Sequence, residues 1–201
     1  MSRGVLVAFE GIDASGKSTQ ARRVAAAHDA LFTFEPGDTR LGAELRRWLL
    51  DASEPMTPAT EALLMLADRA HHVATVIEPA LMEGRSVVTD RFFGSTLAYQ
   101  GYGRGVDLEA LLSATSLALG ALRPDLTVLL DVPVAVADAR RAPNRADRFE
   151  SADGGFRERV RQGFLELAAT QPGWVVVDGT QSLDEVSAAV DVAVAGLAWN
   201  S

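Results

Sequence analysis

A glycine-rich segment near the N-terminus carries residue types that bind a chain of phosphate groups. Gly11, Gly16, Lys17 and Ser18 occupy the fixed positions of the pattern G-x-x-x-x-G-K-[ST]. Glycines allow successive backbone N–H groups to converge on phosphate oxygens, and the start of a following helix adds positive potential. The sequence therefore predicts a nucleoside triphosphate site formed by Gly11, Ile12, Asp13, Ala14, Ser15, Gly16, Lys17, Ser18 and Thr19.

The charged and hydroxyl groups beside this segment predict a magnesium-dependent phosphate site. Lys17 is the only lysine among the 19 basic residues, and it stands where the motif needs a compact positive charge between two phosphates. Ser18 would give one oxygen to Mg²⁺, which takes few protein ligands and keeps most of its waters. Asp90, at the end of the apolar stretch 86–90, would hold the same ion through water. A turn-forming aspartate is the alternative interpretation of Asp90.

Two arginine-bearing segments offer further positive charge for phosphate chemistry. Arg91 directly follows the metal-side aspartate, where it could reach between a donor and an acceptor phosphate. The segment 140–150 holds four arginines and is interrupted by proline and asparagine. We expect a lid at about 141–155 that brings Arg148 or Arg145 to the γ-phosphate and excludes water. An ordinary solvated loop is the alternative interpretation of this cluster.

The composition limits the class of protein. The 201 residues with 48% hydrophobic content are typical of one domain, 1–201, with a single core. The absence of cysteine excludes disulfides and thiolate metal sites. The formal charge of −8 argues against nucleic-acid binding, which needs a basic face. No apolar run is long enough for a membrane span or a signal peptide, so we expect a cytoplasmic protein without a membrane partner.

The elements that would position these residues alternate between strand and helix. Short apolar runs predict buried parallel strands at Val5–Phe9, Leu31–Phe34, Ser86–Thr89, Leu126–Leu130 and Trp174–Val177. Helical periodicity predicts helices at about Lys17–Ala27, Gly42–Leu50, Pro58–Glu83, Asp107–Leu119, Val134–Arg141, Phe156–Ala169 and Leu183–Trp199. This alternation predicts an α/β fold: a five-stranded parallel sheet with helices on both faces.

Ligands of such a sheet bind beyond the carboxyl ends of its strands. Carboxylates gather at that edge, at Glu10, Glu35, Asp90, Asp131 and Asp178. Residues that form turns or cap helices are the alternative interpretation of each of them.

The phosphate loop alone is shared by several classes of protein. A GTPase needs a guanine-reading Asn-Lys-x-Asp motif, which a chain with a single lysine in its phosphate loop lacks. The chain is also short for a translocating ATPase. A small kinase with a second, anionic substrate therefore fits best, and an ATP-binding regulator without transfer activity is the alternative from another class.

The order of several segments resembles the bacterial thymidylate kinase family, P-loop nucleoside monophosphate kinases that make dTDP from dTMP and ATP. The resemblance covers nearly the whole chain. It rests on "FEGIDASGKST", "FEPGDTRLG", "ALLMLADRAHHVATVIEPAL", "DRFFGSTLAYQG" and "RPDLTVLLDVP". The Glu-Pro-Gly segment followed by Asp-Arg and Ser-x-x-x-Tyr-Gln is much more specific than the phosphate loop.

The resemblance implies roles for individual residues. Asp13 would accept a hydrogen bond from the acceptor sugar's 3′-hydroxyl, Arg69 and Arg91 would hold its phosphate, and Tyr99 would crowd the sugar's 2′ position. Arg69 would also read the pyrimidine. The alternatives are a core role for Tyr99 and a salt bridge along its own helix for Arg69. The other implied dTMP-binding residues are Pro36, Met65, Ser95, Thr96 and Gln100. The resemblance also implies catalysis by Lys17, Arg91 and a lid arginine, with Mg²⁺ as cofactor.

The chain departs from the common family pattern at a few positions. Phe34 stands where many members have arginine, Asp38 replaces a second glycine, and Met65 replaces an aromatic ring that stacks on thymine. These changes affect the expected choice of base more than the reaction, so another small kinase, acting on deoxynucleosides or on several pyrimidine monophosphates, stays as an alternative. Ala14 replaces an arginine of some members, which agrees with lid arginines doing that work. Homodimerisation through the apolar faces of 62–77 and 107–119 is also expected from the resemblance.

Overall fold

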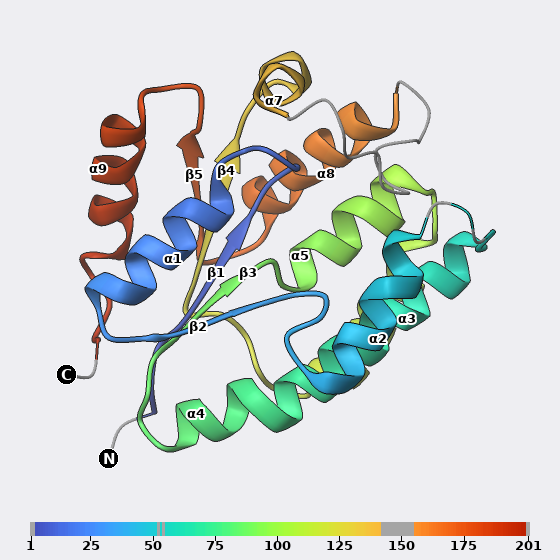
Figure 1. Cartoon of the computed structure of the whole chain (residues 1–201), viewed down its shortest axis with the longest axis horizontal. Helices are drawn as coiled ribbons and strands as arrows, with labels where there is room; N and C mark the ends of the chain where they lie inside the picture. The colour runs from blue at the N-terminus through green and yellow to red at the C-terminus, as the bar shows by residue number, and fades with distance from the viewer. Residues whose placement is uncertain (1–2, 52, 54, 142–154, 200–201) are drawn as a thin grey trace.

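The computed structural model describes residues 3–51, 53, 55–141 and 155–199 (Figure 1). Within them, five parallel strands form one sheet in the order β2-β3-β1-β4-β5. Every predicted strand is present, and the α/β class with a parallel sheet is confirmed. The strands are β1 Leu6–Glu10, β2 Leu31–Phe34, β3 Val87–Asp90, β4 Leu126–Asp131 and β5 Trp174–Asp178.

Helices cover both faces of the sheet (Figure 1). On one face lie α1 (Lys17–Ala27) and α9 (Leu183–Val194), which pack on the strands and on each other. On the other face and beyond it lie α2 (Arg40–Leu50), α3 (Pro58–His72), α5 (Phe93–Thr96), α6 (Leu108–Leu119) and α8 (Phe156–Thr170). The short α4 (Glu78–Met82) and α7 (Val134–Arg140) connect helix to strand and strand to helix.

The central strand β1 shows how the sequence builds this core. All five of its residues are buried, because a parallel sheet with helices on both faces has no solvent-facing side. Side chains alternate between the faces: Val7 and Phe9 join the core beneath α1 and α9, whereas Leu6 and Ala8 join the core on the opposite face. The acidic end of the strand, Glu10, is also buried, at the start of the phosphate loop.

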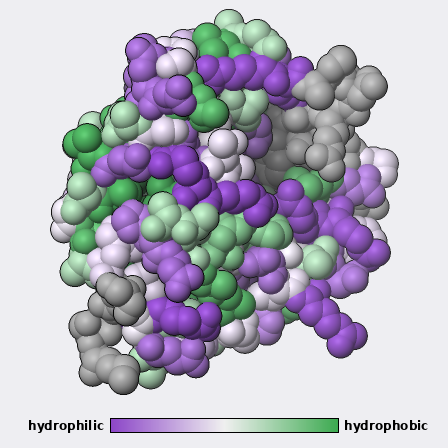
Figure 2. All heavy atoms as spheres, turned by 60° about the vertical axis from the view of Figure 1, so that its left-hand side comes forward, coloured by the Kyte–Doolittle hydropathy of each residue, from purple (hydrophilic) through white to green (hydrophobic). Residues whose placement is uncertain are grey.

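The outer surface on the α1 and α9 side carries both hydrophilic and hydrophobic residues. Figure 2 brings this side forward and shows hydrophilic residues running between hydrophobic patches. Two apolar residues of α9, Leu183 and Val192, are exposed there. Among the described residues, no helix combines the length and the apolar character that crossing a membrane requires.

The predicted helices differ from the structure in three places. The single helix expected at 58–83 is α3, a π-helical segment η1 (Val73–Ile77) and α4 in succession. The helix expected to reach Trp199 ends at Val194, and the Trp199 ring instead stacks on His28 with ring centroids 4.0 Å apart. The third error is the absence of any predicted element at 93–103, where α5 and the π-helical segment η2 (Leu97–Gly103) lie. Their sequence is rich in glycine, so packing rather than helix propensity holds them.

Candidate active site

The predicted phosphate loop lies between β1 and α1 with the backbone that such a loop needs. Gly16 adopts φ 95° at the start of α1, and Gly11 adopts φ 141°. A Cβ atom on Gly11 would lie 2.6 Å from the Leu130 carbonyl oxygen, so only glycine fits there. Ala14 also has a left-handed backbone, with φ 64°. These turns direct the loop around the first residue of the helix, Lys17.

Lys17 lies in a cleft at the carboxyl edge of the sheet. Its side chain is almost fully buried, its Nζ atom donates to the Ile12 carbonyl oxygen at 3.4 Å, and it lies 3.6 Å from Asp13. Burial lowers the pKa of Lys17, and Arg91 lowers it further, against the opposing charge of Asp13. An anionic ligand in the cleft would add to the counter-charge that Asp13 supplies.

Two oxygen groups face the same cleft, as predicted. Asp90 ends β3, and Ser18 is the second residue of α1; both line the cleft together with Lys17 and Arg91. Among the described residues, the buried Oδ1 atom of Asp90 has no hydrogen-bond partner. A buried carboxylate oxygen without a partner is costly, which suggests a ligand or ordered water at this point.

Arg91 connects the phosphate loop with the segment that follows β3. Its backbone is left-handed, with φ 72°, and its carbonyl oxygen accepts from Thr89 Oγ1 at 2.8 Å. One terminal nitrogen donates to the Gly11 carbonyl and to Ser95 Oγ, at 3.1 and 2.9 Å. The other donates to Asp13 Oδ1 and Tyr99 Oη, at 2.6 and 3.1 Å. A strained backbone of this kind is typical of functional positions, where surrounding contacts hold it.

Asp13 lies at the centre of these charges. Burial raises its pKa, but the charges of Arg91 and Lys17 outweigh this effect and hold the pKa well below its usual range. Tyr99 donates a hydrogen bond to Asp13 Oδ2 at 3.1 Å, and burial beside these charges raises the pKa of Tyr99 above its ordinary value. The site therefore presents an ionised carboxylate and a neutral phenol side by side.

A second cavity adjoins the phosphate cleft and shares Asp13 and Arg91 with it. Every residue of the predicted acceptor set lines this cavity: Asp13, Pro36, Met65, Arg69, Arg91, Ser95, Thr96, Tyr99 and Gln100. They come from the phosphate loop, the segment after β2, helix α3, the end of β3, helix α5 and η2, most of which are far apart in the sequence. The fold thus brings the whole predicted set to one place.

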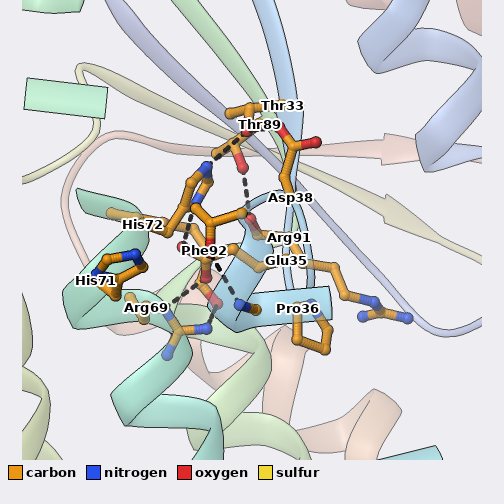
Figure 3. Close-up of polar contacts among 12 residues, drawn as sticks. Thr33, Glu35, Pro36, Asp38, Arg69, His71, His72, Thr89, Arg91 and Phe92 are labelled. Carbon is orange, nitrogen blue, oxygen red and sulfur yellow. Dashed lines mark hydrogen bonds and ion pairs between the residues drawn. The ribbon is translucent and has the colours of Figure 1, made fainter. Parts of the chain in front are cut away.

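Arg69 is a deeply buried charge of this cavity, with 2% of its surface exposed. Its Nε atom donates to Glu35 Oε2 at 2.7 Å, and its terminal nitrogens donate to Thr96 Oγ1 and the Phe92 carbonyl at 2.6 and 2.8 Å (Figure 3). Its ion-pair partner therefore comes from the segment after β2 and not from its own helix. Gln100 is also buried, and its amide nitrogen donates to Glu61 Oε1 at 3.0 Å.

Tyr99 lines the cavity, as the resemblance implies, and its ring also packs in the core, which was the alternative interpretation. Its ring packs edge-on against Phe156 and Phe164, with centroids 6.1 Å away in both pairs, while its hydroxyl bonds with Asp13 and Arg91. The aromatic packing fixes the ring, and the ring then fixes the hydroxyl beside the cavity.

Sequence reasoning missed several residues of the cavity wall. Arg46, Leu50 and Asp68 line it, and so does Glu35, which the sequence marked only as a carboxylate at the end of a strand. Arg46 donates to the Pro36 carbonyl at 2.6 Å, so it holds the Glu-Pro-Gly segment against α2. Asp68 directly precedes Arg69 in the sequence, and this adjacency was the one signal that could have identified Asp68 as a site residue.

Glu10 serves a structural purpose behind the site. One carboxylate oxygen accepts from the backbone N–H groups of Phe92 and Ser95, both at 3.0 Å, and the other accepts from Ser95 Oγ at 2.6 Å. Burial raises the pKa of Glu10 to about 7. The remaining predicted edge carboxylates pair elsewhere: Asp131 with Arg161, and Asp178 with the turn that follows it.

The predicted lid arginines, Arg145 and Arg148, lie outside the described residues. On the far side of that segment, Arg157 of α8 pairs with Asp138 and lies 3.5 Å from the Asp13 carbonyl. Sequence reasoning did not select Arg157, because nothing in the linear pattern links α8 to the phosphate loop.

Comparison with known proteins agrees with this arrangement. The family model for thymidylate kinase matches residues 9–190. The thymidylate kinases of Desulforudis audaxviator and Geobacter sulfurreducens are 51% and 46% identical, over 87% and 93% of this chain and 82% and 94% of their own lengths. The crystal structure of thymidylate kinase from Ehrlichia chaffeensis is similar at a TM-score of 0.78 and 30% identity, over 96% of this chain and 99% of that one. The chain belongs to the thymidylate kinase family.

Proposed function

We infer that this protein transfers the γ-phosphoryl group of ATP to dTMP, giving dTDP and ADP. One observation carries the assignment of this reaction to the site. The cavity lined by the acceptor set adjoins the phosphate cleft, and the two share Asp13 and Arg91. A donor phosphate in the cleft and an acceptor phosphate in the cavity would therefore meet at Arg91.

On the donor side, the phosphate loop would bind the polyphosphate of ATP. Its backbone N–H groups and the start of α1 supply partial positive charge, and Lys17 supplies a full one between the β- and γ-phosphates. The lowered pKa of buried Lys17 supports this role, since an ammonium without a full counter-charge gains most from an incoming anion.

The cleft suits Mg²⁺ held by Ser18 and, through water, by Asp90. Oxygen ligands are those that Mg²⁺ prefers, and the unpartnered Oδ1 atom of Asp90 fits a hydrogen bond to a metal-bound water. When bound, the ion would neutralise charge on the β- and γ-phosphates.

On the acceptor side, the phosphate of dTMP needs no strong base. A phosphate monoester loses its second proton at about pH 6, so the attacking oxygen is ionised at neutral pH. Catalysis then consists of holding the two phosphates in line and neutralising their charge, which Lys17, Arg91 and a lid arginine, Arg148 or Arg145, would share.

The nucleoside would lie against the walls of the cavity. Asp13, held ionised, would accept a hydrogen bond from the 3′-hydroxyl, and the fixed Tyr99 ring beside it would leave no room for a 2′-hydroxyl. Met65 would cover the face of the base, because its thioether is polarizable and adaptable. The other walls near the base are Pro36, Arg69, Thr96 and Gln100.

A panel of acceptors tests this function. Purified protein with Mg²⁺ and ATP should release ADP rapidly with dTMP, more slowly with dUMP and dCMP, and scarcely with thymidine. Identification of dTDP as the product by mass spectrometry completes the test. A preference for a nucleoside over its monophosphate, or ATP binding without any acceptor-dependent ADP release, would refute the assignment.

We also propose that the protein forms a homodimer. Large apolar side chains are exposed on α2, α3 and α6, which are packed beside one another. They are Trp48, Leu63, Leu112 and Leu117. A second copy of the chain would cover apolar surface of this kind on neighbouring helices.

A further inference from the structure

A chain of hydrogen bonds runs behind the acceptor cavity, from the surface residue Asp38 to Arg69 (Figure 3). Thr33 Oγ1 donates to Asp38 Oδ2 and lies 2.6 Å from His72 Nε2. His72 Nδ1 lies 2.9 Å from Glu35 Oε1, and Glu35 Oε2 accepts from Arg69 Nε at 2.7 Å. The four residues other than Asp38 are buried, so these contacts are shielded from water.

The number of protons in this chain determines the state of His72. The Thr33 hydroxyl has one proton, and when it donates this proton to Asp38 its oxygen can only accept from His72. His72 Nε2 must then carry a proton. His72 Nδ1 faces a Glu35 carboxylate oxygen and must carry a proton as well. With both contacts counted as hydrogen bonds, each ring nitrogen carries a proton, which is the imidazolium form.

The ionised state of Glu35 agrees with this count. Burial raises the pKa of Glu35, but the charge of Arg69 and the contact with His72 more than offset it, so the pKa lies below its ordinary value. Protonated Glu35 would be required for a His72 that has no proton on Nδ1, and the paired Arg69 opposes that state.

We propose that His72 is a positioning residue for acceptor binding that works as an imidazolium, with Asp38 holding its second proton through Thr33. His72 then links three parts of the site: the end of β2, the segment 35–38 and α3. This segment brings Pro36 to the cavity, and Glu35 orients Arg69. Asp38 stands where the family commonly has glycine, so the link belongs to this chain rather than to the common pattern.

Loss of one proton would break the chain at a defined place. Neutral His72 keeps the proton on Nδ1, because Glu35 needs it, and its Nε2 becomes an acceptor. Nε2 then competes with Asp38 for the single proton of Thr33. The Asp38 carboxylate loses its donor and, being exposed, turns to water. The segment 35–38 loses its tie to β2, and the acceptor binds less tightly.

Several charged groups surround His72. Those that face it from the end of β2 and from α3 are Glu35, Asp38, Asp68 and Arg69, with His71 next to it in the helix. Burial and the charge of Glu35 raise the pKa of Asp68 to about 6, so Asp68 adds a third negative charge near neutral pH. Three carboxylates against one guanidinium stabilise a cation between them.

The variant Asp38→Asn tests the proposal, because it satisfies neutral His72 equally well. The amide introduced at this position can donate to Thr33 Oγ1, which then donates to His72 Nε2. Nitrogen-15 NMR of the three histidine rings, assigned with His72→Gln, reports the protons directly. We expect both His72 nitrogens to be protonated at pH 7 in the native protein, and we expect the Asp38→Asn variant to lose one proton at a lower pH.

Kinetics provide the second measurement. In the native protein we expect the KM for dTMP to rise severalfold as pH increases through the His72 titration, with a much smaller change in kcat. In Asp38→Asn, the KM should stay level across that range. Asp184→Asn, which removes the same charge on the first turn of α9, is the matched control and should behave as the native protein does.

Two results would overturn the proposal: a singly protonated His72 in the native protein at pH 7, or the same His72 titration in Asp38→Asn and in the native protein. Asp38→Gly, which restores the family residue, provides a further check, since it too should lower the pH at which His72 loses its proton. The kinetic measurement rests on the proposed function, whereas the NMR measurement does not. Absence of kinase activity would refute the proposed function, whereas an NMR spectrum of a singly protonated His72 would refute the present proposal.

Discussion

At the scale of single residues, two cations, Arg91 and Lys17, differ in how their surroundings hold their charge. Arg91 contacts the phosphate loop, the acceptor carboxylate Asp13 and Tyr99 at once, and it has a left-handed backbone. Burial lowers the pKa of Arg91, but Tyr99 and the neighbouring carboxylates outweigh this effect and raise the pKa, so this guanidinium stays charged. For Lys17 the balance is opposite: burial and the charge of Arg91 lower its pKa, and the nearby carboxylates do not offset them. The two cations therefore have different tasks.

Lys17→Met is expected to keep the fold and lose phosphoryl transfer. Methionine fills the same volume, and the ammonium makes one hydrogen bond within the described protein, to Ile12, so stability should change little. Loss of a charge aimed at the transferring phosphate should lower kcat by roughly 10²–10³-fold. Initial rates of ADP release and a thermal melt measure both effects. Arg85→Met, on an exposed loop, is the control; near-native turnover in Lys17→Met would contradict the assignment.

Replacement of Tyr99 separates its ring from its hydroxyl. Tyr99→Ala opens space beside the sugar, so the ratio of kcat/KM for ribothymidine monophosphate over dTMP should rise roughly tenfold. The same change removes packing against Phe156 and Phe164 and should destabilise the fold by about 3–5 kcal/mol. Tyr99→Phe keeps the ring and should keep the discrimination. Equal discrimination in the native and Ala proteins would mean that the ring does not limit the sugar.

At the scale of elements, α5 illustrates a helix that depends on one buried carboxylate. The helix has four residues, too short to form alone, and Glu10 binds two backbone N–H groups at its start. A carboxylate that is buried without a direct ion pair is costly when ionised. Glu10, which accepts hydrogen bonds from the segment after Arg91, therefore makes the stability of the fold depend on pH.

Glu10→Gln should remove that dependence. The folded pKa of Glu10, about 7, lies above its ordinary value of 4.5, so its contribution to stability is present below pH 4.5 and is lost as pH rises through 7. The loss is at most about 3 kcal/mol. Glutamine keeps the acceptor for Phe92 and Ser95 and carries no charge. The stability of the variant relative to the native protein should therefore rise between pH 5 and 8.

Urea unfolding at several pH values measures this difference. Glu109→Gln, in the exposed first turn of α6, is the control and should show no such trend. A difference between the Glu10→Gln and native proteins that stays constant with pH would mean that Glu10 keeps its ordinary ionisation when buried.

The same segment shows where sequence reasoning succeeds and where it fails. The strands were predictable because five apolar runs alternate with helical periodicity, and residues that line the second cavity were predictable because their motifs occur in family order. The element at 93–103 was not, because its support comes from Glu10, more than eighty residues earlier in the chain. The pairing of Glu35 with Arg69 and His72 was missed for the same reason: spacing along a chain does not reveal partners across a fold.

At the scale of the whole molecule, the sheet accounts for the meeting of the two substrates. The phosphate loop follows β1, and Asp90 and Arg91 follow β3, its direct neighbour in the sheet. Parallel neighbours end at the same edge, so donor and acceptor groups lie side by side without a second domain to bring them together. The helices α2, α3 and α6 also expose large apolar side chains to solvent. These exposed side chains are not among the residues that line the two cavities of the site.

We expect those exposed residues to form the dimer interface. Leu63 on α3 is 63% exposed, and Leu117 on α6 is 89% exposed. Light scattering should give about twice the chain mass of 21.4 kDa for the native protein and a single chain mass for Leu63→Glu, because a buried carboxylate in an apolar interface is costly. Met82→Glu is the control, since Met82 on α4 is also open to solvent, at 84%, and does not belong to α2, α3 or α6. A monomeric native protein, or equal dissociation by both variants, would rule out this interface.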